Sequence, residues 1–175
     1  MKRGIYFSVI WFLLFVGVQA HANAVEIKKY HNNGVSFSYP ANWKVSSDVD
    51  TGALRYIFVE SPGNGIFIVQ VYPARSNLSL AEYAKGFANK AKNSSRKIQR
   101  ISLKFSKVTG PGNLGEGVKE DFTIGYLGKV LAHVCYYYQV NRSNKTAYLI
   151  SQSANEDLPK VQNGFKLLQS TFILE

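Results

Sequence analysis

Residues Gly34 to Trp43 read GVSFSYPANW, and this short stretch is the most informative part of the chain about its fold. Its apolar side chains alternate with Ser36 and Ser38, and this period of two residues is typical of a strand with one buried face. Pro40 ends the strand because proline has no backbone N–H to donate to a neighbouring strand. The stretch therefore predicts a strand and a turn at the edge of a hydrophobic core, which we expect to contain Val35, Phe37, Tyr39, Pro40 and Trp43.

The first 24 residues have the three parts of a secretory signal peptide. Lys2 and Arg3 form a positive start, an apolar run extends from Ile5 to Val18, and Ala22-Asn23-Ala24 supplies the small residues that a signal peptidase recognises. A retained membrane anchor is the alternative, but the run is shorter than the ~20 residues that a spanning helix needs. We therefore expect cleavage after Ala24 or a nearby alanine. The product would be exported, periplasmic or secreted, without a transmembrane anchor.

Residues 25–175 are long enough to form one domain with its own core, and no linker or repeat divides them. Hydrophobic residues make up 46% of the chain, and Cys135 is its only cysteine. No intramolecular disulfide can form, so stability must come from packing. The many β-branched and aromatic residues favour a sheet.

The spacing of apolar residues predicts two helices among a series of strands. Ser79 and Glu82 form a capping box that begins the first helix, which ends near Asn93. The second helix is expected from about Glu156 to Ser170. Strands are expected at residues 26–31, 35–39, 44–46, 54–60, 66–72, 98–108, 117–124, 130–140 and 146–153, with a polar loop at 47–52. The segment 130–140 is the longest and most aromatic of these, so we expect it to be central.

This order of segments resembles the PsbP-like superfamily, which includes PsbP of photosystem II, the DcrB-type periplasmic proteins and the Ran-binding Mog protein. The resemblance is carried by GVSFSYPANW, by SLAEY at residues 79–83 and by STF at residues 170–172, and it covers residues 35–172. It implies an α+β fold in which an antiparallel sheet has helices packed on both faces, as an α/β/α sandwich. It also implies a non-enzymatic binding or accessory protein of the cell envelope, and it transfers no catalytic residue. The chain lacks the lipidation cysteine of the DcrB type.

Three patterns that could indicate chemistry are interpreted as structural. Gly110 to Gly115 match G-x-G-x-x-G, but the next residues alternate like a strand, whereas a dinucleotide site needs a helix there. His133 and Cys135 share a strand face, yet no third group orients them, and zinc needs more ligands. The acidic pairs 48/50, 120/121 and 156/157 are expected to be structural or solvated. We therefore expect no catalytic residue, metal or cofactor.

Basic residues are concentrated in one segment. The net charge is +10, of which Lys2 and Arg3 contribute two units, and the stretch between Tyr83 and Gly115 has eight basic residues and no acidic one. These are Lys85, Lys90, Lys92, Arg96, Lys97, Arg100, Lys104 and Lys107. They form either a solvated surface or a footprint for an acidic envelope protein, an anionic lipid or a cell-wall polymer.

The sequence leaves three classes of function open. The first is the binding or accessory protein, the second a carrier of a small ligand or lipid between sheet and helix, and the third an enzyme whose active site follows no motif. Nucleic acid is not an expected partner, because helices on both faces would bury Tyr136, Tyr137 and Tyr138 and leave no exposed rings for stacking.

Overall fold

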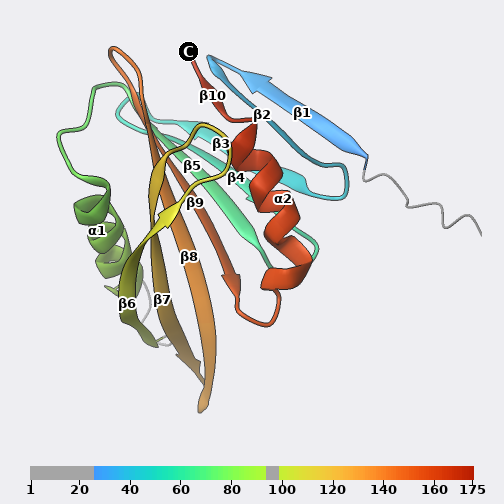
Figure 1. Cartoon of the computed structure of the whole chain (residues 1–175), viewed down its shortest axis with the longest axis vertical. Coiled ribbons are helices and arrows are strands. Elements are labelled where there is room, and N and C mark those ends of the chain that lie inside the picture. Colours follow the sequence, from blue (N-terminus) through green and yellow to red (C-terminus); the bar gives the residue numbers. More distant parts are fainter. Residues whose placement is uncertain (1–25, 94–98) are drawn as a thin grey trace, which may run out of the picture.

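The computed structural model of the chain describes residues 26–93 and 99–175 (Figure 1). The expected signal sequence and the basic residues Arg96 and Lys97 lie outside the described residues. In the part that is described, no helix is both long and apolar enough to cross a membrane.

The centre of the molecule is a seven-stranded sheet in the order β3-β4-β5-β9-β8-β7-β6. Its strands are β3 (Lys44–Asp50), β4 (Arg55–Glu60), β5 (Ile66–Tyr72), β6 (Gln99–Thr109), β7 (Glu116–Tyr126), β8 (Lys129–Asn141) and β9 (Thr146–Ala154). Every neighbouring pair is antiparallel. The segment 130–140 lies in β8, an interior strand that pairs with β7 on one side and β9 on the other, and β9 is the middle strand of the seven.

The GVSFSYPANW stretch belongs to a second, three-stranded sheet, which the sequence did not predict. This sheet has the order β1-β2-β10 and consists of β1 (Ile27–Asn32), β2 (Val35–Pro40) and β10 (Ile173–Leu174). A two-residue turn with positive φ at Asn33 and Gly34 joins β1 to β2, as expected for a hairpin turn of this composition. The side chains expected in the core are placed as follows: Val35, Phe37, Pro40 and Trp43 are buried, and Tyr39 is half-buried against the same core.

The two helices cover opposite faces of the main sheet. On one face, Tyr83 of α1 (Leu80–Asn93) stacks on Tyr148 of β9, with ring centroids 3.5 Å apart. On the other face, Gln169 of α2 (Leu158–Ser170) donates a hydrogen bond to Ser151 of β9. Residues 148 and 151 of one strand point to opposite sides because side chains alternate along it. The expected α+β fold, an antiparallel sheet with helices on both faces, is confirmed.

Side-chain chemistry explains how α1 begins and how α2 is fixed to the small sheet. The capping box of α1 is present: Glu82 accepts from the Ser79 backbone N–H, and its own N–H donates to Ser79 Oγ at 3.2 Å. Phe165 of α2 meets Trp43 edge to face at a ring-centroid distance of 5.4 Å. Trp43, which follows the end of β2, thus packs against α2.

The loop expected at residues 47–52 is mostly strand, because β3 continues to Asp50. An acidic side chain lies on this strand, but it is compensated: Arg55 Nε lies 2.8 Å from Asp48 Oδ1, and Asn32 Nδ2 donates to Oδ2 at 2.9 Å. Tyr30 Oη donates to the same carboxylate. These bonds, that from Arg55 above all, hold the pKa of Asp48 well below its ordinary value. The polar composition of residues 47–50 indicated a loop, but the ion pair between Asp48 and Arg55 permits a strand there.

Candidate functional site

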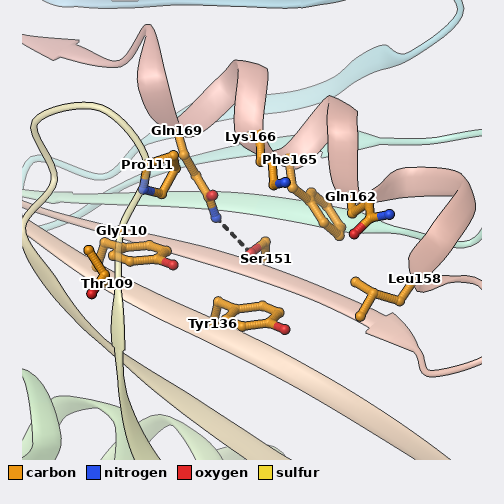
Figure 2. A pocket seen from close by; sticks show the side chains of 11 residues that line it. Thr109, Gly110, Pro111, Tyr136, Ser151, Leu158, Gln162, Phe165, Lys166 and Gln169 are labelled. Carbon is orange, nitrogen blue, oxygen red and sulfur yellow. Dashed lines mark hydrogen bonds between the residues drawn. The ribbon is translucent and has the colours of Figure 1, made fainter.

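A pocket of about 300 Å³ lies between α2, the β6–β7 loop and the main sheet (Figure 2). Its floor is formed by Tyr136 and Tyr138 of β8 and Ser151 of β9, which face α2. Ser151 pairs directly with Tyr136 in the register of the two strands. The remaining lining residues come from the loop and from one side of the helix: Thr109, Gly110, Pro111, Leu158, Gln162, Phe165, Lys166 and Gln169.

Regular spacing on α2 creates the helical wall of this pocket. Residues 158, 162, 165, 166 and 169 recur at intervals of three or four, which places them on one face of a helix. Phe165 is buried toward Trp43, whereas Gln162 and Lys166 are exposed at the mouth of the pocket. Gln169 is buried, and its Nε2 donates to Ser151 Oγ at 2.9 Å. The wall therefore has Phe165 and the Gln169 amide at depth and polar side chains at its opening.

Glycine lets the β6–β7 loop approach the floor. A Cβ built on Gly110 would lie 2.8 Å from Cε1 of Tyr138, and one on Gly117 would lie 2.3 Å from the same atom. Gly112 and Gly115 have positive φ, which other residues rarely adopt. The interpretation of G-x-G-x-x-G as a hairpin connection is confirmed, and the loop now also forms one rim of the pocket.

The pocket supplies binding groups and no catalytic pair. The described residues that line it include no histidine, carboxylate or cysteine. Burial raises the pKa of Tyr138 to about 12, so its phenol stays protonated at neutral pH. The Ser151 hydroxyl faces an amide, which cannot remove its proton. What remains is aromatic surface, hydrogen-bonding groups and the Lys166 ammonium at the mouth.

The basic segment requires a correction at Arg100, which is buried and does not belong to a surface. Only 4% of Arg100 is exposed, and its Nη2 lies 2.7 Å from Oε2 of the fully buried Glu120. Its guanidinium carbon lies 3.4 Å from the ring centroid of Phe122. Tyr137 and Ser102 also donate to Glu120, each at 2.6 Å. Arg100 is therefore part of a buried polar network, although its place in the strand pattern predicted an exposed side chain.

The described lysines of the segment do not form one surface. Lys85, Lys90 and Lys92 are exposed on α1. Lys107 pairs with Glu116 at 2.9 Å, which cancels its charge locally. Lys104 pairs in register with Asp121, so it lies on the sheet face opposite Glu120 and α1. Of the described lysines of the segment, only Lys85 and Lys92, seven residues apart, share a side of α1, and Lys90 points to another side of the helix.

His133 and Cys135 occupy structural positions. Burial raises the pKa of the Cys135 thiol to about 12, which leaves it protonated and unreactive at neutral pH. His133 stacks on Phe122 with ring centroids 5.3 Å apart. Within residues 26–93 and 99–175, no cluster of three metal-ligating side chains occurs.

No feature of the sequence indicated the α2 pocket. Its residues come from four segments spread over residues 109–169, and each segment has a structural explanation of its own. The nearest signal was the row of three tyrosines on β8, which we interpreted as core. Tyr137 and Tyr138 are buried as expected, and Tyr136 is half-buried at the pocket floor.

Comparisons with known proteins support the architecture. No protein-family model and no curated protein sequence matches the chain. Among solved structures, cyanobacterial PsbP (CyanoP) of Synechocystis sp. PCC 6803 is similar with a TM-score of 0.58 and 13% identity, over 91% of this chain and 99% of that chain. LpqN of Mycobacterium tuberculosis, involved in cell envelope biogenesis, is similar with a TM-score of 0.46 and 11% identity, over 85% and 90% of the two chains.

A third similar structure is the Ran-binding protein Mog1p of Saccharomyces cerevisiae, with a TM-score of 0.44 and 8% identity over 82% of this chain and 86% of that chain. Identities this low concern the fold and leave activity open. With the strand order and the two covering helices described above, the similarity to CyanoP shows that this chain has the PsbP-like fold.

Proposed function

We propose that this chain is an exported, non-enzymatic binding protein of the cell envelope, and that the pocket beside α2 binds a small ligand. The observation that carries the proposal is the open pocket itself, floored by tyrosines and bordered by a helix and a loop. Export is supported by the signal-peptide pattern of residues 1–24.

The lining favours a small aromatic carboxylic acid. A volume of about 300 Å³ is at the lower end of the range for ligand pockets, so the ligand must be small. The rings of Tyr136 and Phe165 offer faces and edges against which an aromatic ring can pack. Lys166 at the mouth offers a positive charge, and no carboxylate in the lining opposes it. A carboxylate near Lys166, with a ring on the tyrosine floor, satisfies both parts of the pocket.

The proposal that the site is not catalytic rests on the same side chains. Hydrolytic or group-transfer chemistry needs a nucleophile with a neighbouring base. Ser151 is the only hydroxyl at the floor besides the two phenols, and its neighbour is the Gln169 amide. A binding role uses the aromatic rings and the Lys166 ammonium of the lining without requiring a base.

Calorimetric titration with phenylacetate and with phenylacetamide tests this proposal. The two probes share a ring and differ in charge, so we expect measurable binding of the acid and weaker binding of the amide. Lys166→Gln removes an exposed charge and should weaken phenylacetate binding several-fold without changing amide binding. Lys85→Gln, on the opposite face of the sheet, is the matched control. Absence of phenylacetate binding, or equal affinity of wild type and Lys166→Gln, would contradict the proposal.

A second candidate function is the binding of an acidic envelope partner through α1. Lys85, Lys90 and Lys92 are exposed on this helix, and the sequence between Tyr83 and Gly115 has no acidic residue to offset them. Affinity capture from envelope extracts at low and high salt tests this candidate. Capture should be lost at high salt and in the triple lysine-to-glutamine variant, because contact between exposed charges is screened by ions. Capture that is insensitive to salt would count against it.

A further inference from the structure

The end of the β7–β8 hairpin is apolar and exposed. Leu127 and Val130 are 83% and 70% exposed, and Leu131 follows them on β8. We call these three residues the hairpin tip. On the neighbouring strand β6, Ile101 and Leu103 are also exposed, which extends the apolar surface along the start of that strand. Isolated exposed hydrophobic residues are ordinary, but a group of this kind at one end of a sheet indicates a contact surface.

The hairpin tip projects beyond the central strand of the sheet (Figure 1). The register of β8 with β9 ends at the pair His133 and Ala154, so residues 129–132 continue past the ladder between these strands. Beyond it, the Asn155 N–H donates to the Ala132 carbonyl at 2.9 Å. The tip is therefore a convex projection rather than part of a groove.

The turn at the tip contains a residue that does not suit its backbone conformation. Leu127 and Gly128 join Tyr126 to Lys129 and have φ of 49° and 77°. Positive φ at both positions of a two-residue hairpin turn favours Asn-Gly, and leucine is strained there. The β1–β2 turn of the same molecule has the favoured Asn33-Gly34 in the equivalent conformation. An exposed, strained leucine is unfavourable for folding on both counts, so it points to a use outside the fold.

The charge around the tip is positive. Lys129 is exposed beside Leu127, whereas the exposed Lys104 of β6 is farther from the tip and lies opposite Asp121. No acidic residue lies in the β7–β8 turn, in β8 or in β6. Glu156 and Asp157 follow Asn155, which bonds to Ala132, and Asp157 is paired with Lys160. An apolar projection with a lysine in its turn suits the boundary of an anionic bilayer, where leucine and valine side chains enter the acyl region and a lysine ammonium group contacts headgroup phosphates.

We propose that the hairpin tip inserts into the surface of a lipid bilayer with anionic headgroups and so holds the protein at a membrane. A bilayer fits a convex projection better than a protein partner does, because a protein would need a matching pocket, whereas lipid adapts its shape to the tip. This contact is separate from the α2 pocket, which is bordered by α2 and the β6–β7 loop rather than by the β7–β8 turn.

Vesicle sedimentation tests the proposal with protein purified after expression of the full chain. Vesicles of phosphatidylcholine, with and without phosphatidylglycerol, are the probes, and we expect stronger binding to the anionic vesicles. Leu127→Asn replaces the strained residue by one that suits the turn, so it should keep or raise the melting temperature. Combined with Val130→Thr, it should weaken vesicle binding tenfold or more, because two apolar side chains no longer enter the bilayer.

Val49→Thr is the matched control, since Val49 is 52% exposed on β3, the opposite edge strand of the sheet. It should bind vesicles like the wild type. In Leu127→Trp, the added tryptophan emission should shift to the blue on vesicle addition and be quenched by brominated lipid. The proposal is overturned if the wild type binds neither vesicle, if the double variant binds like the wild type, or if binding is lost only when Lys85, Lys90 and Lys92 are replaced, which would place the contact on α1.

Discussion

The contact between Gly164 of α2 and the Trp43 ring gives the sharpest test of how the GVSFSYPANW stretch packs against α2. Gly164 is buried in the helix, and a Cβ built on it would lie 2.3 Å from Cζ2 of Trp43 and 2.8 Å from Cε2 and Cη2. Carbon atoms in good contact are ~3.5–4.0 Å apart, so a methyl group at this position requires the ring or the helix to move by about 1 Å. The ring is also packed against Phe165, which limits that movement.

We predict that Gly164→Ala destabilises the protein, although the same change usually stabilises a helix. In a helix interior, alanine is favoured over glycine by ~0.5–1 kcal/mol. Overpacking of a core costs ~1–3 kcal/mol, and the rigid indole places this site in that range. The expected net effect is a loss of about 1–2 kcal/mol in the free energy of unfolding, from the difference of these two terms.

Gly86→Ala on α1 is the matched control, because nothing lies within 4 Å of a Cβ at that position. We expect this variant to gain ~0.5–1 kcal/mol from helix propensity alone. Urea denaturation monitored by circular dichroism measures the free energy of unfolding of both variants. In a thermal melt, each kcal/mol corresponds to a shift of ~2–4 °C in Tm for a domain of this size. If Gly164→Ala proves as stable as the wild type or as Gly86→Ala, the steric argument is refuted. Trp43→Phe should recover part of the loss in the Gly164→Ala background.

Three further predictions concern buried and paired side chains. Arg100→Met should lower the free energy of unfolding by ~3–5 kcal/mol in urea denaturation, because Glu120 is left buried without its cation, and adding Glu120→Leu should restore part of that loss. The pKa of Asp48 is lowered in the folded protein, so its bonds to Arg55 contribute stability at pH values above ~4, the ordinary pKa of the carboxyl. This contribution disappears as the pH falls through the lower folded-state pKa. Asp48→Asn should therefore flatten the acid side of a Tm–pH curve. Cys135 should resist a thiol reagent at pH 8 in the folded protein and react promptly in urea, since burial both shields the thiol and raises its pKa to about 12.

Each of these predictions has an outcome that contradicts it. Equal stability of wild type and Arg100→Met would mean that the buried pair contributes nothing. A Tm–pH curve of Asp48→Asn parallel to that of the wild type would remove Asp48 from the acid response. Labelling of Cys135 in the folded state at the rate seen in urea would show that the sheet interior opens readily.

The sequence predicted local structure well wherever one short segment contained the whole signal. The Ser79–Glu82 capping box begins α1 as expected, and segment 66–72 is a strand with the predicted bounds. Alternation along 35–39 indicated the buried face of β2 correctly. These features depend on backbone geometry and on the spacing of hydrophobic residues within a short segment, and both can be read directly from the sequence.

Features that depend on long-range pairing were not predicted. Arg100 appeared to be one of eight surface cations. It is buried because it pairs with Ile124 of β7 and extends across Phe122 to Glu120 on the same face of that strand. The strand β10 is only two residues long, too short for a period, and it exists because Leu174 pairs with Val35. In both cases the deciding partner lies far away along the chain.

By itself, the sequence determined most of the secondary structure and the regional excess of positive charge, because these follow from spacing and composition, and its resemblance to the PsbP-like superfamily implied the α+β class. Only the tertiary structure decided where the GVSFSYPANW stretch lies, which cations remain at the surface, and that a pocket and an apolar hairpin tip exist. A pocket is a gap between segments that are distant in sequence, and exposure is a property of what fails to cover a side chain. Neither can be obtained from a residue and its immediate neighbours.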